Sequence, residues 1–172
     1  MTSSKLSRAG RGGNSVLEFT LVGIPMIFLL ISSFEMSRGM WIYHTLANSV
    51  KVGARYASVH GQLCATSPKT CTVTAAQVAA QVQNGGIGLD PKQLSLTFTT
   101  QGVAPVSCVL SNCLSKSSGC PDPAGYSIGN TFEIDATYPF TSMISMFWPG
   151  SFSLGTMGTI NLPASSKMRI QF

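Results

Sequence analysis

One apolar stretch close to the N-terminus decides how this chain folds. Residues 16–34 read Val-Leu-Glu-Phe-Thr-Leu-Val-Gly-Ile-Pro-Met-Ile-Phe-Leu-Leu-Ile-Ser-Ser-Phe, and Glu18 near the start carries the single charge. A helix needs about 20 apolar residues to cross the hydrocarbon core of a bilayer. The stretch therefore predicts a transmembrane helix over residues 14–35.

A cleaved secretory signal and a buried core helix are the two alternatives to a membrane span. A signal peptide has a shorter apolar core, about 7–15 residues, which ends at a small-residue cleavage site. Here the apolar run is longer, and it ends in Ser-Ser-Phe-Glu at residues 32–35. A buried core helix is disfavoured because the run begins directly behind a basic N-terminal segment.

The basic residues that flank the stretch predict its orientation. Lys5, Arg8 and Arg11 precede it with no acid among them, and the nearest basic residue behind it is Arg38. Because basic flanks stay on the cytoplasmic side, we expect a cytoplasmic N-terminus. The chain beyond residue 36 then lies outside, in the periplasm if the membrane is a bacterial inner membrane.

Composition argues against an ordinary cytosolic enzyme. Only 10% of the 172 residues are charged, against about 25% in a typical soluble domain. The net charge of +5 at first suggests nucleic-acid binding, but three of the eleven basic residues lie before Asn14. Without them eight basic residues face six acidic ones, a net charge of +2. We therefore expect no nucleic-acid partner.

All the cysteines follow the apolar stretch, where an oxidising compartment favours disulfides. We expect two bridges and one free thiol: a short Cys64–Cys71 bridge, and one bridge within the later three cysteines. Spacing alone cannot give the connectivity, and the spacings do not match the usual zinc motifs, so no metal is expected. The candidates are Cys64, Cys71, Cys108, Cys113 and Cys120.

The helix is expected to continue beyond the membrane as an amphipathic segment over residues 36–60, ending near Gly61. Apolar residues recur at spacings of three and four, which is typical of one helix face. We expect this face to pack on a small globular domain or on a neighbouring subunit, and Pro25 and Gly39 to be points of bending. The face consists of Met36, Met40, Tyr43, Ala47, Val50, Ala54 and Ala57.

The remaining chain, residues 61–172, predicts a globular α+β domain with a small antiparallel sheet. A helix over residues 74–85 is indicated by a capping Thr74 and a terminal Gly85. Alternating apolar residues predict strands at 94–99 and 132–138, the second ended by Pro139. We expect a disulfide-stapled loop over residues 101–130, a turn at 148–150, and a last strand or strands within 156–162 and 165–170.

A basic leader that ends in glycine, followed by Glu18 and an apolar helix, resembles the N-terminus of a type IV prepilin-like protein. The resemblance implies that a prepilin peptidase cuts between Gly13 and Asn14, which makes Glu18 the fifth residue of the mature chain. The new Asn14 amine would pair with Glu18 of a neighbouring subunit, and an unpaired buried charge is costly. The alternative is that Glu18 merely lies at the interface, near the positive end of its own helix.

Further stretches narrow the resemblance to the TadE-like family, minor pseudopilins of the tight-adherence (Tad/Flp) pilus system. The similarity covers Gly13 to Glu35 with Phe19 directly after the glutamate, and it includes the closing Glu35-Met36-Ser37-Arg38. The stretch 48–57 carries it as specifically, and the similarity extends more weakly to 137–140 and 165–169. It implies a subunit that primes or joins an adhesive pilus or secretion apparatus. The implied partners are a prepilin peptidase, other pilins, an inner-membrane assembly platform and the lipid bilayer.

The sequence contains no pattern that indicates an enzyme or a cofactor. Glu133 and Asp135 share one face of a predicted strand, where a solvated surface is the simpler interpretation than a catalytic pair. His44 and His60 are interpreted as surface or packing residues of the long helix. The rival function is that of an uncleaved, membrane-anchored periplasmic binding module or enzyme, in which Glu18 has no role.

Overall fold

A computed structural model describes residues 12–60, 73–116, 129–142 and 159–171. It contains a long helix, α1 (Gly12–Val59), and two further helices, α2 (Ala75–Gly85) and the four-residue α3 (Leu110–Cys113). The strands are β1 (Ser95–Thr100), β2 (Val106–Val109), β3 (Thr131–Thr141) and β4 (Thr159–Arg169). The expected architecture, a long apolar N-terminal helix followed by a small antiparallel sheet, is confirmed.

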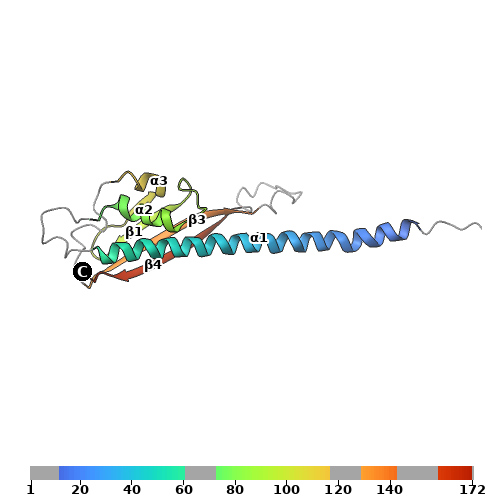
Figure 1. Ribbon diagram of the computed structural model, residues 1–172, viewed down its shortest axis with the longest axis horizontal. Helices are drawn as coiled ribbons and strands as arrows, with labels where there is room; N and C mark the ends of the chain where they lie inside the picture. Colours follow the sequence, from blue (N-terminus) through green and yellow to red (C-terminus); the bar gives the residue numbers. More distant parts are fainter. Residues whose placement is uncertain (1–11, 61–72, 117–128, 143–158, 172) are drawn as a thin grey trace, which may run out of the picture.

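Helix α1 continues without interruption from the apolar stretch into the sheet domain. It passes Pro25 and Gly39 and ends at Val59, two residues before the expected stop. Figure 1 shows its C-terminal half lying along the domain and its N-terminal half extending beyond it. The C-terminal half of α1 is therefore part of the folded domain, whereas its N-terminal half protrudes from it.

The four strands form one antiparallel sheet in the order β2-β1-β3-β4. In β3, side chains alternate between a buried set, which includes Phe132 and Ile134, and a more exposed set, which includes Glu133 and Asp135. Because successive strand residues face opposite sides, one sheet face is buried and the other is polar. The buried face packs on the helices, and α1 contacts α2, β3 and β4.

The hydrophobic core lies between that sheet face and the helices. It takes Leu46, Val50 and Ala54 from α1 and joins them to apolar residues of α2 and of the sheet. Helix α2 begins with a capping box, in which the Thr74 hydroxyl accepts a hydrogen bond from the Gln77 backbone N–H and the Gln77 side chain accepts one from Thr74 N–H. The predicted helix over residues 74–85 is thus confirmed, and its start has the expected chemistry.

The apolar face expected over residues 36–60 packs on the domain in its second half only. Met36, Met40 and Tyr43 are exposed, whereas Val50, Ala54 and Ala57 are buried as expected. The buried face instead begins with a polar group and includes several small residues: Glu35, Leu46, Ser49, Gly53 and Ser58. Apolar spacing alone does not predict this face, because small and polar residues make the close contacts.

The expected loop over residues 101–130 contains a strand and a helix. β2 pairs with β1 through Phe98↔Val106 to Ser95↔Val109. α3 follows at once, and its Leu110 N–H donates a hydrogen bond to the Leu94 carbonyl. Among the described residues the segment is therefore an ordered edge of the sheet.

Pro139 does not end its strand, contrary to expectation. β3 runs on to Thr141, and Pro139 pairs with Asn161 of β4. Its pairing with β1 stops at Thr137, so only one side of Pro139 faces a neighbouring strand. A proline is tolerated at such a half-open position because it has no N–H to donate to the ladder.

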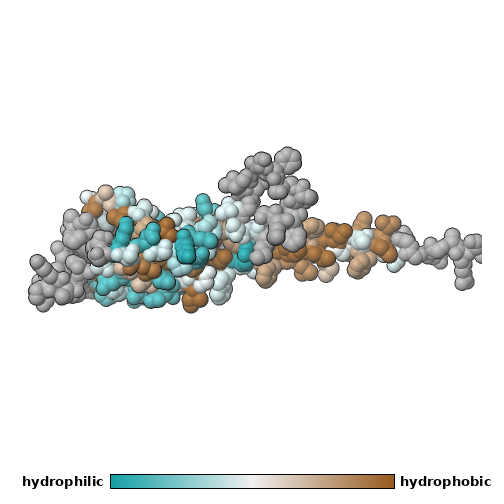
Figure 2. Space-filling model, turned by 90° about the horizontal axis from the view of Figure 1, so that it is seen from above, coloured by the Kyte–Doolittle hydropathy of each residue, from teal (hydrophilic) through white to brown (hydrophobic). Residues whose placement is uncertain are grey.

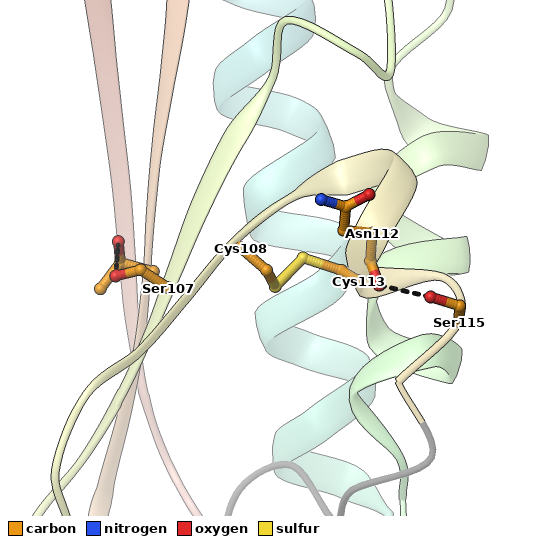
Figure 3. Close-up of a disulfide and its surroundings, with 6 residues drawn as sticks. Ser107, Cys108, Asn112, Cys113 and Ser115 are labelled. Carbon is orange, nitrogen blue, oxygen red and sulfur yellow. Dashed lines mark hydrogen bonds between the residues drawn. A yellow bond between two sulfur atoms is a disulfide. The ribbon is translucent and has the colours of Figure 1, made fainter.

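A disulfide joins Cys108 at the end of β2 to Cys113 at the end of α3, as Figure 3 shows. It confirms the one bridge that was expected within the later three cysteines. Cys113 is completely buried and Cys108 packs against the core. Cys64, Cys71 and Cys120, like the predicted turn at 148–150, lie outside the described residues.

Candidate functional site

The apolar half of α1 is the most unusual surface of the described structure. From Val16 to Phe34 nearly every large apolar side chain is more than half exposed, and Leu21 reaches 77%. Figure 2 shows this segment as a brown rod that protrudes from a largely teal domain. Water does not tolerate an apolar surface of this extent, so it must be covered by lipid or by other protein.

Among the described helices, one is long and apolar enough to cross a membrane, and it is α1. None of its most apolar window is buried against the domain, which distinguishes it from the core helix of a soluble protein. The nineteen residues 16–34 correspond to a rise of about 28 Å at 1.5 Å per residue. That length is close to the roughly 30 Å of a bilayer core, so the helix is compatible with a membrane anchor.

Glu18 and Phe19 lie next to each other on this exposed rod. Both side chains are exposed, and Phe19 is 77% accessible. Within the described part of the chain, no cation forms an ion pair with the Glu18 carboxylate. The hydroxyl of the nearby Thr20 donates to the carbonyls of Val16 and Leu17, which satisfies it inside the helix. Glu18 is thus left as an exposed acceptor on an apolar surface.

The proposed processing site lies at the first turn of α1. The backbones of Gly13 and Asn14 are helical. Lys5, Arg8 and Arg11, expected to set the topology, lie outside the described residues. The structure therefore brings Gly13, Asn14, Glu18 and Phe19 together on one helix end, while their roles stay predictions.

A polar contact fastens the sheet to α1 directly behind the apolar stretch. The Arg38 guanidinium lies 3.3 Å from the Glu35 carboxylate, and it also donates to the carbonyl of Thr141 at the end of β3. Its carbon stands 4.7 Å from the centre of the Phe140 ring. Glu35 is only 7% exposed, so the contact neutralises a buried carboxylate. We call Glu35, Arg38, Phe140 and Thr141 the boundary contact.

Sequence reasoning noted Glu35 and Arg38 as part of a resemblance but missed this contact. Arg38 and Thr141 are separated by 103 positions, so spacing along the chain gives no sign of it. The available signal was the position of an acid and a base three residues apart, directly behind an apolar run. Such a pair occupies neighbouring positions on one helix face.

The remaining charged candidates lie on the domain surface. Glu133 accepts a hydrogen bond from Ser165 and pairs with Lys167 at 3.4 Å on the polar sheet face. This is the solvated strand face that the sequence favoured over a catalytic pair. The His60 ring stacks on Tyr56 with 4.1 Å between centroids, and the exposed His44 lies edge-on to Tyr43.

Comparison with known proteins gives a match over the same part of the chain. A family model described as TadE-like protein matches residues 13–55, about a quarter of the sequence. No curated protein and no solved structure matches the chain. The match begins at Gly13, the residue before the expected cut, and extends to Arg55, two turns into the region that packs on α2. Residues 13–55 are therefore similar to the TadE-like family, a family associated with the Tad pilus.

Proposed function

We propose that this protein is a minor pseudopilin of a Tad-type pilus, anchored through α1 and assembled through the same helix. The observation that carries the proposal is the exposed apolar half of α1 with a single carboxylate, Glu18, near its start. A plain anchor needs the apolar length but not the acid. A helix that moves from lipid into a bundle of like helices needs the apolar length while it is in lipid and the carboxylate to pair with a neighbouring helix.

Removal of residues 1–13 creates a cation for Glu18, which forms no ion pair within the described residues. The cut exposes an ammonium group on Asn14, four residues before Glu18. Within one helix the two groups are held at fixed positions, but between neighbouring subunits they meet when the helices are shifted in register. Pairing then offsets the cost of a carboxylate in an apolar environment, so the pair favours one register of assembly.

The distribution of basic residues supports an external position for the sheet domain. Arg38 is the first basic residue after the span, while three basic residues precede it. With the N-terminus cytoplasmic, residues 61–172 are periplasmic, where the Cys108–Cys113 disulfide persists. A prepilin peptidase and an inner-membrane assembly platform are the partners on the membrane side, and other pilins are the partners in the filament.

Processing is tested by co-expressing the chain with a prepilin peptidase and measuring its intact mass. The expected result is loss of residues 1–13, with retention of the full mass when the peptidase is omitted. Gly13→Val abolishes the cut, whereas the matched leader variant Gly10→Val leaves it intact. A full-length mass in the presence of an active peptidase would overturn the proposal and favour an uncleaved anchored module.

A further inference from the structure

We propose that the sheet domain rests on the membrane that α1 spans, against the leaflet facing away from the cytoplasm. A groove beside the boundary contact then lies in the lipid headgroup layer. The groove has a volume of about 930 Å³ and lies between α1 and the segment that follows α2. The proposal rests on the membrane anchoring proposed above and adds a second contact with lipid, made by the domain itself. The residues that carry it are Met36, Met40, Trp41 and Ile87.

The boundary contact leaves no helical stalk between membrane and domain. Arg38 binds the Thr141 carbonyl and faces the Phe140 ring, which also approaches Gly39. These helix residues stand only four and five positions beyond Phe34, a rise of about 6–8 Å. The end of β3 is therefore held at the level where the hydrocarbon core gives way to headgroups.

The groove side chains are exposed although they are large and apolar. Met36 is 75% accessible, Met40 57%, Trp41 69% and Ile87 77%. The first three continue the exposed surface of the span onto the domain, whereas Ile87 reaches the groove from another part of the chain. An apolar surface assembled from two segments, and continuous with a membrane helix, is best covered by the same lipid.

Polarity changes along the groove as it does across a membrane interface. The end nearest the span is lined by Met36 and Met40 together with Ser33 and Ser37, whose hydroxyls donate to carbonyls of their own helix. Trp41 follows, and the far end is lined by His44, Thr45 and Asn48. Trp41 stands seven residues beyond Phe34, about 10 Å, and helical side chains lean back toward the N-terminus. Its ring thus falls in the headgroup layer, where tryptophan is enriched.

Fluorescence quenching by brominated lipids tests the contact of the groove with lipid in the full-length chain. The protein carries two tryptophans, so the Trp148→Phe variant reports on Trp41 alone. It is reconstituted at high lipid excess into phosphatidylcholine vesicles brominated near the glycerol end of the acyl chain or near the methyl end. We expect at least twofold stronger quenching of Trp41 by the shallow bromines.

Three variants in a Trp41→Phe, Trp148→Phe background complete the test. Ile87→Trp places a reporter across the groove and is expected to be quenched by the shallow bromines. Val59→Trp lies 18 residues beyond Trp41 on the same helix, about 27 Å, and is expected to be unquenched. Phe28→Trp lies within the span and is expected to respond most to the deep bromines.

Each outcome decides the matter. If Phe28→Trp is quenched while Trp41, Ile87→Trp or both stay unquenched, the contact of the groove with lipid is overturned and the membrane anchor stands. Absence of quenching at Phe28→Trp overturns both the anchor and the contact of the groove with lipid. Blue-shifted Trp41 emission that no bromolipid quenches means that protein covers the groove, which also overturns the proposal.

Discussion

The guanidinium of Arg38 lies between the carboxylate of Glu35 and the ring of Phe140, and so joins α1, directly behind its apolar half, to the end of β3. Replacing Arg38 with alanine removes an ion pair, a hydrogen bond to Thr141 and the ring contact, and leaves Glu35 buried. We expect the free energy of unfolding to fall by about 1–3 kcal/mol, measured by chemical unfolding of the full chain in detergent. Lys92→Ala, an exposed cation without an ion pair among the described residues, is the control and is expected to be neutral.

At Gly53, α1 leaves no room for a side chain against α2. A Cβ on Gly53 would lie 2.5 Å from Cγ2 of Val82 and 3.4 Å from Cδ1 of Ile134. We expect Gly53→Ala to destabilise the domain by about 1–3 kcal/mol, since overpacking outweighs the better helix propensity of alanine. Thermal unfolding checks this.

Gly39 provides the matched control on the same helix. A Cβ there would stand 3.7 Å from the Phe140 ring, an ordinary contact, so Gly39→Ala is expected to be neutral or slightly stabilising. Adding Val82→Ala to Gly53→Ala is expected to recover part of the loss. Equal stability of the two single alanine variants would contradict the close approach.

The Cys108–Cys113 disulfide closes a small loop, with a sequence separation of 5. The chain-entropy model gives about 2 kcal/mol for a loop of that size, so the Cys108→Ser, Cys113→Ser variant is expected to remain folded but less stable. In a chain whose other three cysteines are serine, a thiol-alkylating reagent should add no mass until a reductant is supplied. Alkylation of the unreduced, denatured protein would show that the bridge is absent.

Glu18→Ala separates processing from assembly. We expect it to be cut after Gly13 like the parent chain, because the change does not touch the cleaved bond. Its incorporation into pili is expected to fall by roughly a hundredfold to a few thousandfold, since one member of a buried pair left alone costs about 3–5 kcal/mol. Immunoblotting of sheared pili measures this, with Glu133→Ala as the carboxylate control. Normal incorporation of a processed Glu18→Ala chain would remove the pairing argument.

Features that depend on neighbours in sequence could be predicted. The apolar run over residues 16–34 needs no partner in its own domain to be recognised as a helix. The capping box at Thr74 and Gln77 is a local exchange of hydrogen bonds, and the alternation in β3 follows from strand geometry. One cysteine bridge was expected within a small set, and the structure selects Cys108–Cys113.

Features set by distant packing could not be predicted. The small residues Gly53 and Ser49 of α1 lie against α2, where larger side chains would not fit. This contact fixes which face of α1 is turned to the domain, and Met36 and Met40 lie on the face that stays exposed. The strand β2 has only four residues, and its register depends on pairing with β1. The link from Arg38 to Thr141 depends on the complete β3–β4 ladder, which no local pattern encodes.

The sheet ends, in the described part of the chain, in an eleven-residue edge strand, β4, which has β3 as its neighbour on one side alone. Such an edge invites identical chains to join sheet to sheet, a hazard for subunits that are concentrated in two dimensions. β4 carries Pro163 at its middle and Lys167 beyond it, both of which interrupt or repel an incoming strand. Fusion of sheets edge to edge is thereby disfavoured, which is consistent with the proposed assembly through α1 rather than through the sheet.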